Sequence, residues 1–341
     1  MDLFTTDVLI GVVQDLKAMV KSPLVDKFFP TATYDTVEEI HFDLIDNKRR
    51  LAPFVSPLVE GQIVAAEGYQ TKTFRPAYLK PKQVWSPWQA LKRPAGAPLA
   101  SQTDPMNNTR IALANMLSGQ VTMIKRRLEV MAAEALRTGK VTVTGDKYPT
   151  VVVDFQRAAG QTITLAGGAR WGQAGVNPLD SLEDWSQLAL QGSGAELNDV
   201  IMTLDVWKSF RTNDQVTEQL ATQRRLGEMP TLDQGAPMGE GLVFKGVING
   251  FNIYVYSGWY RDANDVEQPI LPAGTVILTG QQVEGVQAFG AILDERAGYR
   301  ALDYFPTSWI DDDPPVRFVM TQSAPLMVPR RVNATVAATV L

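Results

Sequence analysis

Residues 104–140 read DPMNNTRIALANMLSGQVTMIKRRLEVMAAEALRTGK, and this stretch predicts one long helix. Asp104 is a typical N-cap residue and Pro105 suits the first helical position, while Gly139 and Lys140 mark the end. Between these ends apolar residues recur at spacings of three and four, which indicates a continuous apolar stripe. The stripe consists of Leu117, Val121, Ile124, Leu128, Met131 and Ala135.

The length of this helix bears on the shape of the molecule. At ~1.5 Å per residue it would be roughly 50 Å long, and a compact globule of this chain length would be about 50 Å across. The helix would then span the whole molecule. We therefore expect an elongated, flattened subunit, which is unusual for an enzyme and natural for a tile.

The segments around the helix predict an α+β fold. Residues 6–20 have the spacing of an amphipathic helix, and residues 38–46 suggest a strand. Residues 141–145 and 150–156 are β-prone and are expected to cover the apolar stripe as a sheet.

A second unit of helices and strands is expected to begin at Asn177. Within it the Asn249-Gly250 pair is a strong signal for a tight hairpin. The C-terminal residues 334–341, ATVAATVL, are apolar and β-prone, and we expect them to return to the first sheet.

Residues 51–93 differ from the rest because prolines and glycines interrupt short β-prone pieces. A stretch of ~40 such residues is far longer than an ordinary connection and cannot form a core of its own. It could lie on another chain, or it could be an irregular surface hairpin packed on its own domain. Composition alone favours the hairpin.

Composition excludes most enzyme chemistry. The 341 residues carry a net charge of −5, include no cysteine and contain a single histidine, His41, so disulfides, thiolate nucleophiles and multi-histidine metal sites are ruled out. His41 is interpreted as a solvated strand residue. No cofactor or metal is expected. The acidic N-terminus does not resemble a signal peptide, and no apolar run reaches the ~20 residues needed to cross a bilayer, so no membrane partner is expected.

Two other classes of function stay open on the residues alone. Paired carboxylates would suffice for a glycoside hydrolase, and the acidic candidates are Asp180, Glu183, Asp184, Asp294, Glu295, Asp311, Asp312 and Asp313. An oligomeric adhesion module would need a ligand pocket, but Trp185 and Trp207 lie in helical apolar patterns that favour core packing.

Four collinear segments resemble the lambda-like major capsid proteins of tailed bacteriophages, the phage major capsid protein E family. They are LAPFVSPLVEG (51–61), FRPAYLKPK (74–82), ILPAGTVIL (270–278) and MTQSAPLMVP (320–329). The resemblance extends along nearly the full length of the chain.

The resemblance implies the Hong Kong 97 phage capsid fold, and it reverses the preference for a self-packed hairpin. The parts it implies are an N-terminal arm (1–46), an extended E-loop with flanking strands (47–102), a peripheral domain (103–176, with a spine helix at 104–139), an axial domain (177–290) and a return to the peripheral domain (291–341).

The resemblance also implies which residues carry the function. Contacts between subunits are expected in the E-loop at Phe54, Val55, Leu58, Val59, Tyr69, Phe74 and Tyr78, and in the N-terminal arm at Val8, Leu9, Val12 and Leu16. Lys125, Arg126 and Arg127 are either a solvated helix face, which we favour, or a surface that faces DNA. Lys72, Lys80 and Lys82 are available for the cross-link known in one member of the fold, but none is proposed as catalytic.

The implied function is structural. The chain would assemble with itself into pentamers and hexamers of an icosahedral shell around packaged double-stranded DNA, bound without sequence specificity, and the shell would expand from a procapsid. The implied partners are a decoration protein at threefold positions, a scaffold protein and a portal at one vertex. The implied location is the virion, after assembly in the host cytoplasm.

Overall fold

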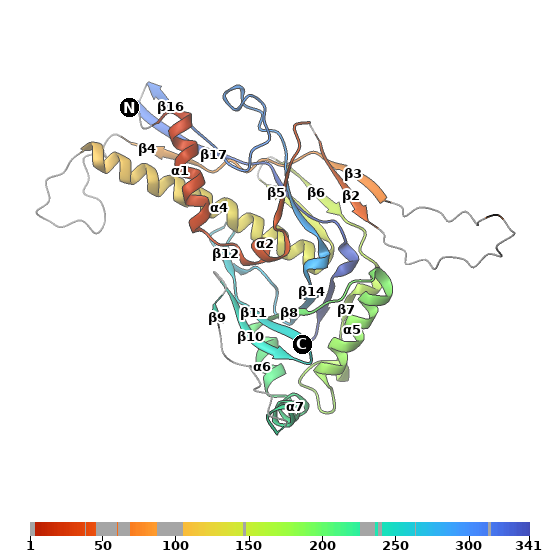
Figure 1. Cartoon of the computed structure of the whole chain (residues 1–341). Coiled ribbons are helices and arrows are strands. Elements are labelled where there is room, and N and C mark those ends of the chain that lie inside the picture. The colour runs from red at the N-terminus through yellow and green to blue at the C-terminus, as the bar shows by residue number, and fades with distance from the viewer. Residues whose placement is uncertain are drawn as a thin grey trace, which may run out of the picture.

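The computed structural model describes residues 4–37, 39–45, 60, 69–86, 105–145, 148–225, 236–237, 241–262, 264–312 and 315–341. Its longest element is helix α4 (Pro105–Thr138), which runs through the upper part of the molecule in Figure 1. A second body, built on a seven-stranded sheet, lies below one end of this helix. The long helix expected from residues 104–140 is confirmed.

Helix α4 ends where the sequence predicts. Gly139 has a positive φ of 67° and its N–H donates to the Ala135 carbonyl at 2.9 Å, which is the left-handed C-cap that glycine favours. The predicted N-cap, Asp104, lies outside the described residues. The stripe is buried as expected, and Leu117, Val121, Ile124 and Leu128 are at most 3% exposed.

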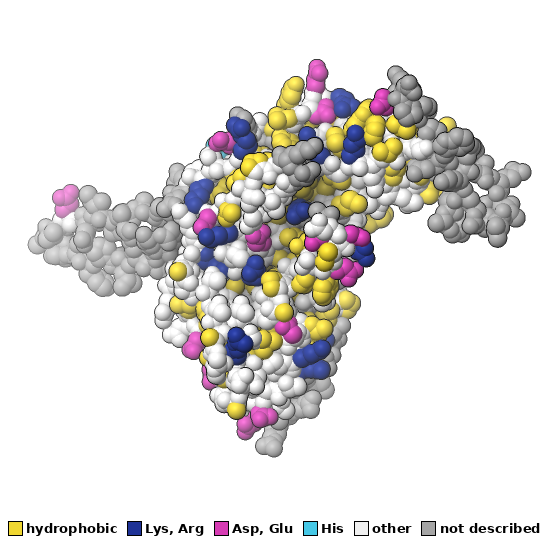
Figure 2. Space-filling model, turned by 180° about the vertical axis from the view of Figure 1, so that it is seen from behind, with side chains coloured by type: hydrophobic (Ala, Val, Ile, Leu, Met, Phe, Trp, Pro, Cys, Tyr) yellow, Lys and Arg dark blue, Asp and Glu magenta, His cyan; other side chains and the backbone are white. Residues whose placement is uncertain are grey.

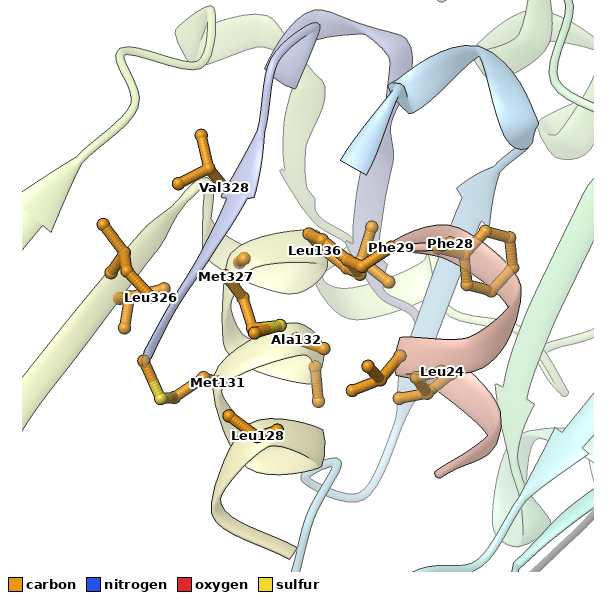
Figure 3. Packing of buried hydrophobic residues seen from close by; sticks show 14 of the residues in the cluster. Leu24, Phe28, Phe29, Leu128, Met131, Ala132, Leu136, Leu326, Met327 and Val328 are labelled. Atoms are coloured by element: carbon orange, nitrogen blue, oxygen red, sulfur yellow. The ribbon is translucent and has the colours of Figure 1, made fainter. Parts of the chain in front are cut away.

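The buried stripe of α4 packs between the N-terminal arm and the C-terminal strands. We use the name N-terminal arm for helices α1 (Thr6–Met19) and α2 (Pro23–Phe28) and strand β1 (Thr31–Tyr34), which lie within residues 1–46. Figure 3 shows Leu24 of α2 on one side of α4 and Leu326 and Val328 of strand β18 on the other. Segments from both ends of the chain therefore share one core with this helix.

Small sheets and hairpins surround α4. Strand β1 pairs with β15 (Gly285–Phe289), which pairs with β18 (Pro325–Pro329). Strands β16 (Phe305–Asp312), β17 (Pro315–Gln322) and β4 (Lys82–Trp85) form a second sheet. The two-stranded sheets are β2 (Ile40–Ile45) with β3 (Tyr69–Phe74), β5 (Lys140–Gly145) with β6 (Tyr148–Asp154), and β12 (Trp259–Arg261) with β13 (Glu267–Pro269).

The seven-stranded sheet forms the second body. Its strands, in spatial order, are β7 (Thr162–Thr164), β19 (Val336–Thr339), β14 (Thr275–Thr279), β8 (Asp199–Thr203), β11 (Phe251–Tyr256), β10 (Leu242–Ile248) and β9 (Ala236–Pro237). The helices of this body are α5 (Pro178–Ser193), α6 (Leu204–Arg211) and α7 (Asp214–Arg225). The predicted hairpin is confirmed, because Asn249 and Gly250 both have positive φ between β10 and β11.

The central strands of this sheet are buried on both faces. In β8, Val200 and Met202 belong to the core of α5 and α6, whereas Ile201 belongs to the core of α4. All five residues of β8 are buried, which explains the uninterrupted apolar run Val200-Ile201-Met202 at its centre. The sheet therefore separates the helices of the second body from the core of α4.

The C-terminal strand does not lie where we expected it. The expectation that residues 334–341 return to the first sheet is wrong, because β19 pairs with β14 and β7 in the seven-stranded sheet. The physical reason is burial: the edge of β14 next to this strand lies in the core and needs a partner, and the small side chains of Ala337 and Ala338 are only 3% exposed there.

Candidate assembly surfaces

Side chains from α4 and the chain just after it hold the surrounding elements in place. Gln120 is fully buried; its amide donates to the Val319 carbonyl at 2.9 Å and accepts from the Thr321 hydroxyl at 2.7 Å, which fixes β17 on the helix. Further along α4, Lys125 and Glu129 contact the N-terminal arm. All three residues are buried polar groups with partners, as stable interiors require.

Arg157 joins the end of α4 to the seven-stranded sheet. Its guanidinium donates to the carbonyls of Leu136, at 2.7 Å, and Arg137, and to the Thr162 hydroxyl at 2.7 Å. The last carbonyls of a helix have no partner inside the helix, so a cation there satisfies them and suits the helix dipole. Burial, with a smaller contribution from Arg137, lowers the pKa of Arg157 to about 10, so the group is still charged at neutral pH.

Replacing Arg157 by Met should therefore destabilise the chain. We expect Arg157→Met to lower the free energy of unfolding by about 2 kcal/mol, because hydrogen bonds from a charged donor are lost and carbonyls at the end of α4 are left without partners. Urea denaturation followed by circular dichroism measures this. Arg170→Met is the control: Arg170 is exposed, and its change should be within about 0.5 kcal/mol. Equal losses for the two variants would contradict the capping role.

The expected E-loop residues fall into three groups. Phe54, Val55, Leu58 and Val59 lie outside the described residues. Tyr69 begins β3, and its side chain is not described. Phe74 ends β3 and is buried in the core of its own chain, and Tyr78 is half-buried and donates to the Ala291 carbonyl at 2.6 Å. Strands β3 and β4 of the 47–102 range therefore pair with the rest of the chain.

The apolar face of α1 packs on its own chain. Leu9 and Val13 are buried in the core of α4, and Val12 and Leu16 pack partly buried against it, while Val8 keeps an intermediate exposure. The side chains of Val8, Val12 and Leu16 are therefore the ones of this set that keep solvent-accessible surface, which a neighbouring subunit could contact.

The three basic residues of α4 do not share one environment. Lys125 is only 9% exposed and bonds to carbonyls of the arm, whereas Arg126 and Arg127 are exposed. Helical spacing offers a signal for this difference, because Lys125 follows Val121 of the apolar stripe by four residues, whereas Arg126 and Arg127 lie off the stripe. Among the residues that Figure 2 colours by type, Lys and Arg side chains are scattered between acidic and hydrophobic ones and form no single patch on this face.

Three of the acidic candidates, Asp180, Glu183 and Asp294, make structural contacts, and Asp313 lies outside the described residues. Asp180 accepts from Asn177 at 2.6 Å, and Glu183 accepts from Asn249 at 3.4 Å. Partial burial raises the pKa of Asp294, but hydrogen bonds from Arg296 and Gln322 outweigh this effect and hold the pKa below its ordinary value. Among the described residues, no three His, Asp or Glu side chains are grouped so that they could hold a metal ion.

Comparisons with known proteins agree with this arrangement. The model of the family "Phage major capsid protein E" matches residues 5–340. The chain is 33% identical to the major capsid protein of Escherichia phage N15 over 335 residues, 96% of each chain. It is 31% identical to the major capsid protein of Escherichia phage lambda over 312 residues, 90% of each chain.

Solved structures show the same fold. A prophage capsid protein from E. coli CFT073 superposes with a TM-score of 0.75 at 24% identity, over 98% of this chain and 99% of that one. A phage-related protein from Bordetella bronchiseptica superposes with a TM-score of 0.56 at 11% identity. The fold is the α+β fold of the Hong Kong 97 type that the resemblance implied.

The chain belongs to the family of lambda-like phage major capsid proteins, which are structural proteins of the head shell and not enzymes. The resemblance noted in the four sequence segments is confirmed, and the hydrolase alternative is set aside. In the described part of the chain, no helix combines the length and the apolar character that a membrane span requires.

Proposed function

We propose that this chain assembles with itself into pentamers and hexamers of an icosahedral shell that encloses double-stranded DNA in the virion. Assembly takes place in the host cytoplasm, and the shell expands from a procapsid. A scaffold protein, a portal at one vertex and a decoration protein at threefold positions are the further partners. The match of the family model from residue 5 to residue 340 is the observation that carries this proposal.

The shape of the subunit supports a role as the repeating unit of a shell. Helix α4 has 34 residues, which at ~1.5 Å per residue is about 50 Å of rigid element. It joins the N-terminal arm and the sheet β16–β17–β4 to the seven-stranded sheet. A subunit of this shape offers different faces to successive neighbours, as the heterologous interfaces of closed rings require.

The β2–β3 hairpin supports a contact between subunits. Among the described residues it is a sheet of two strands, from Ile40 to Ile45 and from Tyr69 to Phe74, and such a sheet is marginal without further packing. Phe42 and Phe74 attach its base to the core of α4. We propose that the segment between the two strands, with Phe54, Val55, Leu58 and Val59, binds a neighbouring subunit.

Two further surfaces belong to the proposal. Helix α1 contacts a neighbour through its partly exposed side chains Val8, Val12 and Leu16. Packaged DNA is bound without sequence recognition, and Arg126 and Arg127 are exposed candidates for that face. Lys125 is occupied by the arm of its own chain and is not among the candidates.

Replacing residues 47–67 by a short Gly-Ser linker tests the proposal, because it preserves both strands of the hairpin. We expect a subunit with unchanged circular dichroism and melting temperature that no longer forms closed shells. Negative-stain electron microscopy of protein expressed with its native neighbours measures shell formation, and the unaltered chain should give closed shells under the same conditions.

A milder pair of variants separates side-chain contacts from loop length. The apolar set Phe54→Ser, Val55→Ser, Leu58→Ser and Val59→Ser should lower the yield of shells at least about tenfold, because removing buried apolar contacts costs about 1 to 3 kcal/mol each. The polar set Ser56→Ala and Gln62→Ala in the same loop should leave the yield unchanged. Normal shells from the linker variant would refute the role of the loop, and failure of the unaltered chain to form shells would refute the function itself.

A further inference from the structure

Two oppositely charged side chains on α4 hold the turn between α1 and α2. Lys125 and Glu129 are four residues apart, so they lie on one face of the helix, and they are only 9% and 4% exposed. Both continue the buried stripe, at the spacing set by Val121. Burying a charged group is costly unless the group is paired or hydrogen-bonded. Both side chains should therefore have polar partners.

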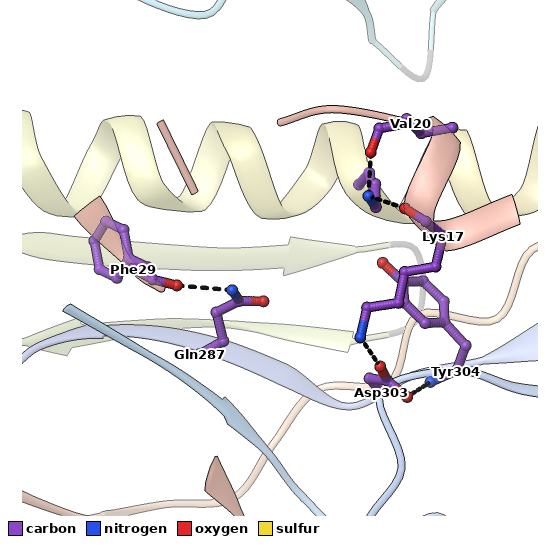
Figure 4. Close-up of polar contacts among 7 residues, drawn as sticks. Lys17, Val20, Phe29, Gln287, Asp303 and Tyr304 are labelled. Atoms are coloured by element: carbon purple, nitrogen blue, oxygen red, sulfur yellow. Dashed lines mark hydrogen bonds and ion pairs between the residues drawn. The ribbon is translucent and has the colours of Figure 1, made fainter. Parts of the chain in front are cut away.

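Lys125 binds the end of α1. Its ammonium donates to the carbonyl of Lys17 at 2.7 Å and to the carbonyl of Val20. Figure 4 shows these two carbonyls converging on one nitrogen beside α4. The last carbonyls of α1 have no partner inside the helix, and a cation at a helix C-terminus is electrostatically favoured.

Glu129 binds the beginning of α2 and, at the same time, the seven-stranded sheet. Its carboxylate accepts from the backbone N–H groups of Leu24, at 2.9 Å, and Val25, at 3.2 Å. The hydroxyl of Tyr256, in β11, donates to the same carboxylate at 3.1 Å. One side chain of α4 is therefore the common contact of the N-terminal arm and the second body.

We propose that Lys125 and Glu129 form a clasp that couples the docking of the N-terminal arm to the position of the seven-stranded sheet, and that proton binding at Glu129 adjusts the strength of this clasp. The proposal concerns a conformational device within the subunit and does not depend on which surfaces the assembled shell uses.

The charged and titratable groups around Glu129 come from every element packed against it. They are Asp26 of α2, Lys21 of the turn, Lys125 and Arg126 of α4, and Tyr256 of β11. Burial raises the pKa of Glu129 to about 7, the hydrogen bonds from Leu24, Val25 and Tyr256 act in the opposite direction, and Asp26 raises it further.

The sign of the pH effect follows from linkage. When the arm leaves α4, Glu129 becomes solvated and its pKa returns toward the ordinary value of 4.5. The docked state binds the proton more tightly, so docking is strongest at low pH, weakens as the pH rises toward about 7, and is constant above the docked pKa. Between about pH 6 and about pH 8 the docking equilibrium should weaken about tenfold.

Hydrogen exchange of the full-length, unassembled subunit tests the device. Mass spectrometry follows the peptide that covers residues 20–29, with rates corrected for the pH dependence of exchange in an unstructured peptide. In the unaltered chain, protection should fall about tenfold from about pH 6 to about pH 8. Glu129→Gln should remove this pH dependence, and Glu134→Gln, five residues further along the same helix, should retain it.

A second variant tests the coupling even if Glu129→Gln folds poorly. Tyr256→Phe removes a hydrogen bond that favours the carboxylate, so the midpoint of the protection profile should move to higher pH although the substitution lies in β11. Lys125→Met should raise exchange in residues 14–21 about tenfold or more. A pH-dependent profile in Glu129→Gln equal to that of the unaltered chain, or an unmoved midpoint in Tyr256→Phe, would overturn the proposal.

Discussion

Gly285→Ala is expected to lower the free energy of unfolding by about 3 kcal/mol or more. A Cβ atom at Gly285 would lie 2.2 Å from the carbonyl oxygen of Phe28 and 2.6 Å from the ring of Phe29. Neither obstacle is the end of a flexible side chain, so strand β15 or the end of α2 has to move. Overpacking of a filled core costs about 1 to 3 kcal/mol and more where the backbone must shift.

Gly119→Ala is the matched control for this substitution. Gly119 lies inside α4, and a Cβ atom there would meet nothing within 4 Å. Because alanine favours a helix over glycine by about 1 kcal/mol, this variant should be as stable as the unaltered chain or more stable. Urea denaturation of the unassembled subunits measures both. A Gly285→Ala variant that unfolds like Gly119→Ala would show that the arm does not pack against β15 this closely.

Phe29→Ala is expected to cost about 3 to 5 kcal/mol, the range for a large buried aromatic side chain. Phe29 follows α2, is fully buried, and belongs to the core of α4. Its carbonyl also accepts a hydrogen bond from Gln287 at 2.7 Å, which holds the backbone in place and limits how far the cavity can collapse (Figure 4).

Tyr34→Ala is the control for Phe29→Ala, because it also removes an aromatic ring from the arm but one that is only partly buried. Tyr34 stacks on Phe289 with ring centroids 5.7 Å apart, but Tyr34 is 49% exposed. Its loss should cost about 1 kcal/mol, since an aromatic pair contributes about 0.5 to 1.5 kcal/mol beyond area burial. The difference between the two variants, measured as free energies of unfolding in urea, should be at least about 2 kcal/mol. Equal values would mean that the arm is not part of the folded core.

Much of the secondary structure follows from local signals. The apolar spacing of α4, its glycine end and the tight turn at Asn249-Gly250 all act over a few residues, so their effect can be predicted without tertiary contacts. Helix α1 is likewise confirmed at Thr6–Met19, as its spacing indicates. The family resemblance was also visible in short collinear segments, and the family comparison confirms it.

The long-range polar contacts were not predictable in the same way. Gln120, Glu129 and Arg157 have no distinctive local pattern, and their partners lie 199, 105 and 21 residues away in sequence. The one available signal was that Lys125 and Glu129 occupy stripe positions of an amphipathic helix, where a charge needs a buried partner. Which partner it finds depends on the path of the arm.

The sequence by itself determined the long helix, the strands with strong apolar patterns, the hairpin turn and the exclusion of cysteine and multi-histidine chemistry, because each depends on neighbours along the chain or on composition. Only the tertiary structure decided that β19 joins the seven-stranded sheet, that Lys125 binds the arm, and that Glu129 meets Tyr256. These outcomes depend on which buried edges and unpaired polar groups meet across long sequence separations, and several alternatives satisfy the same local pattern equally well.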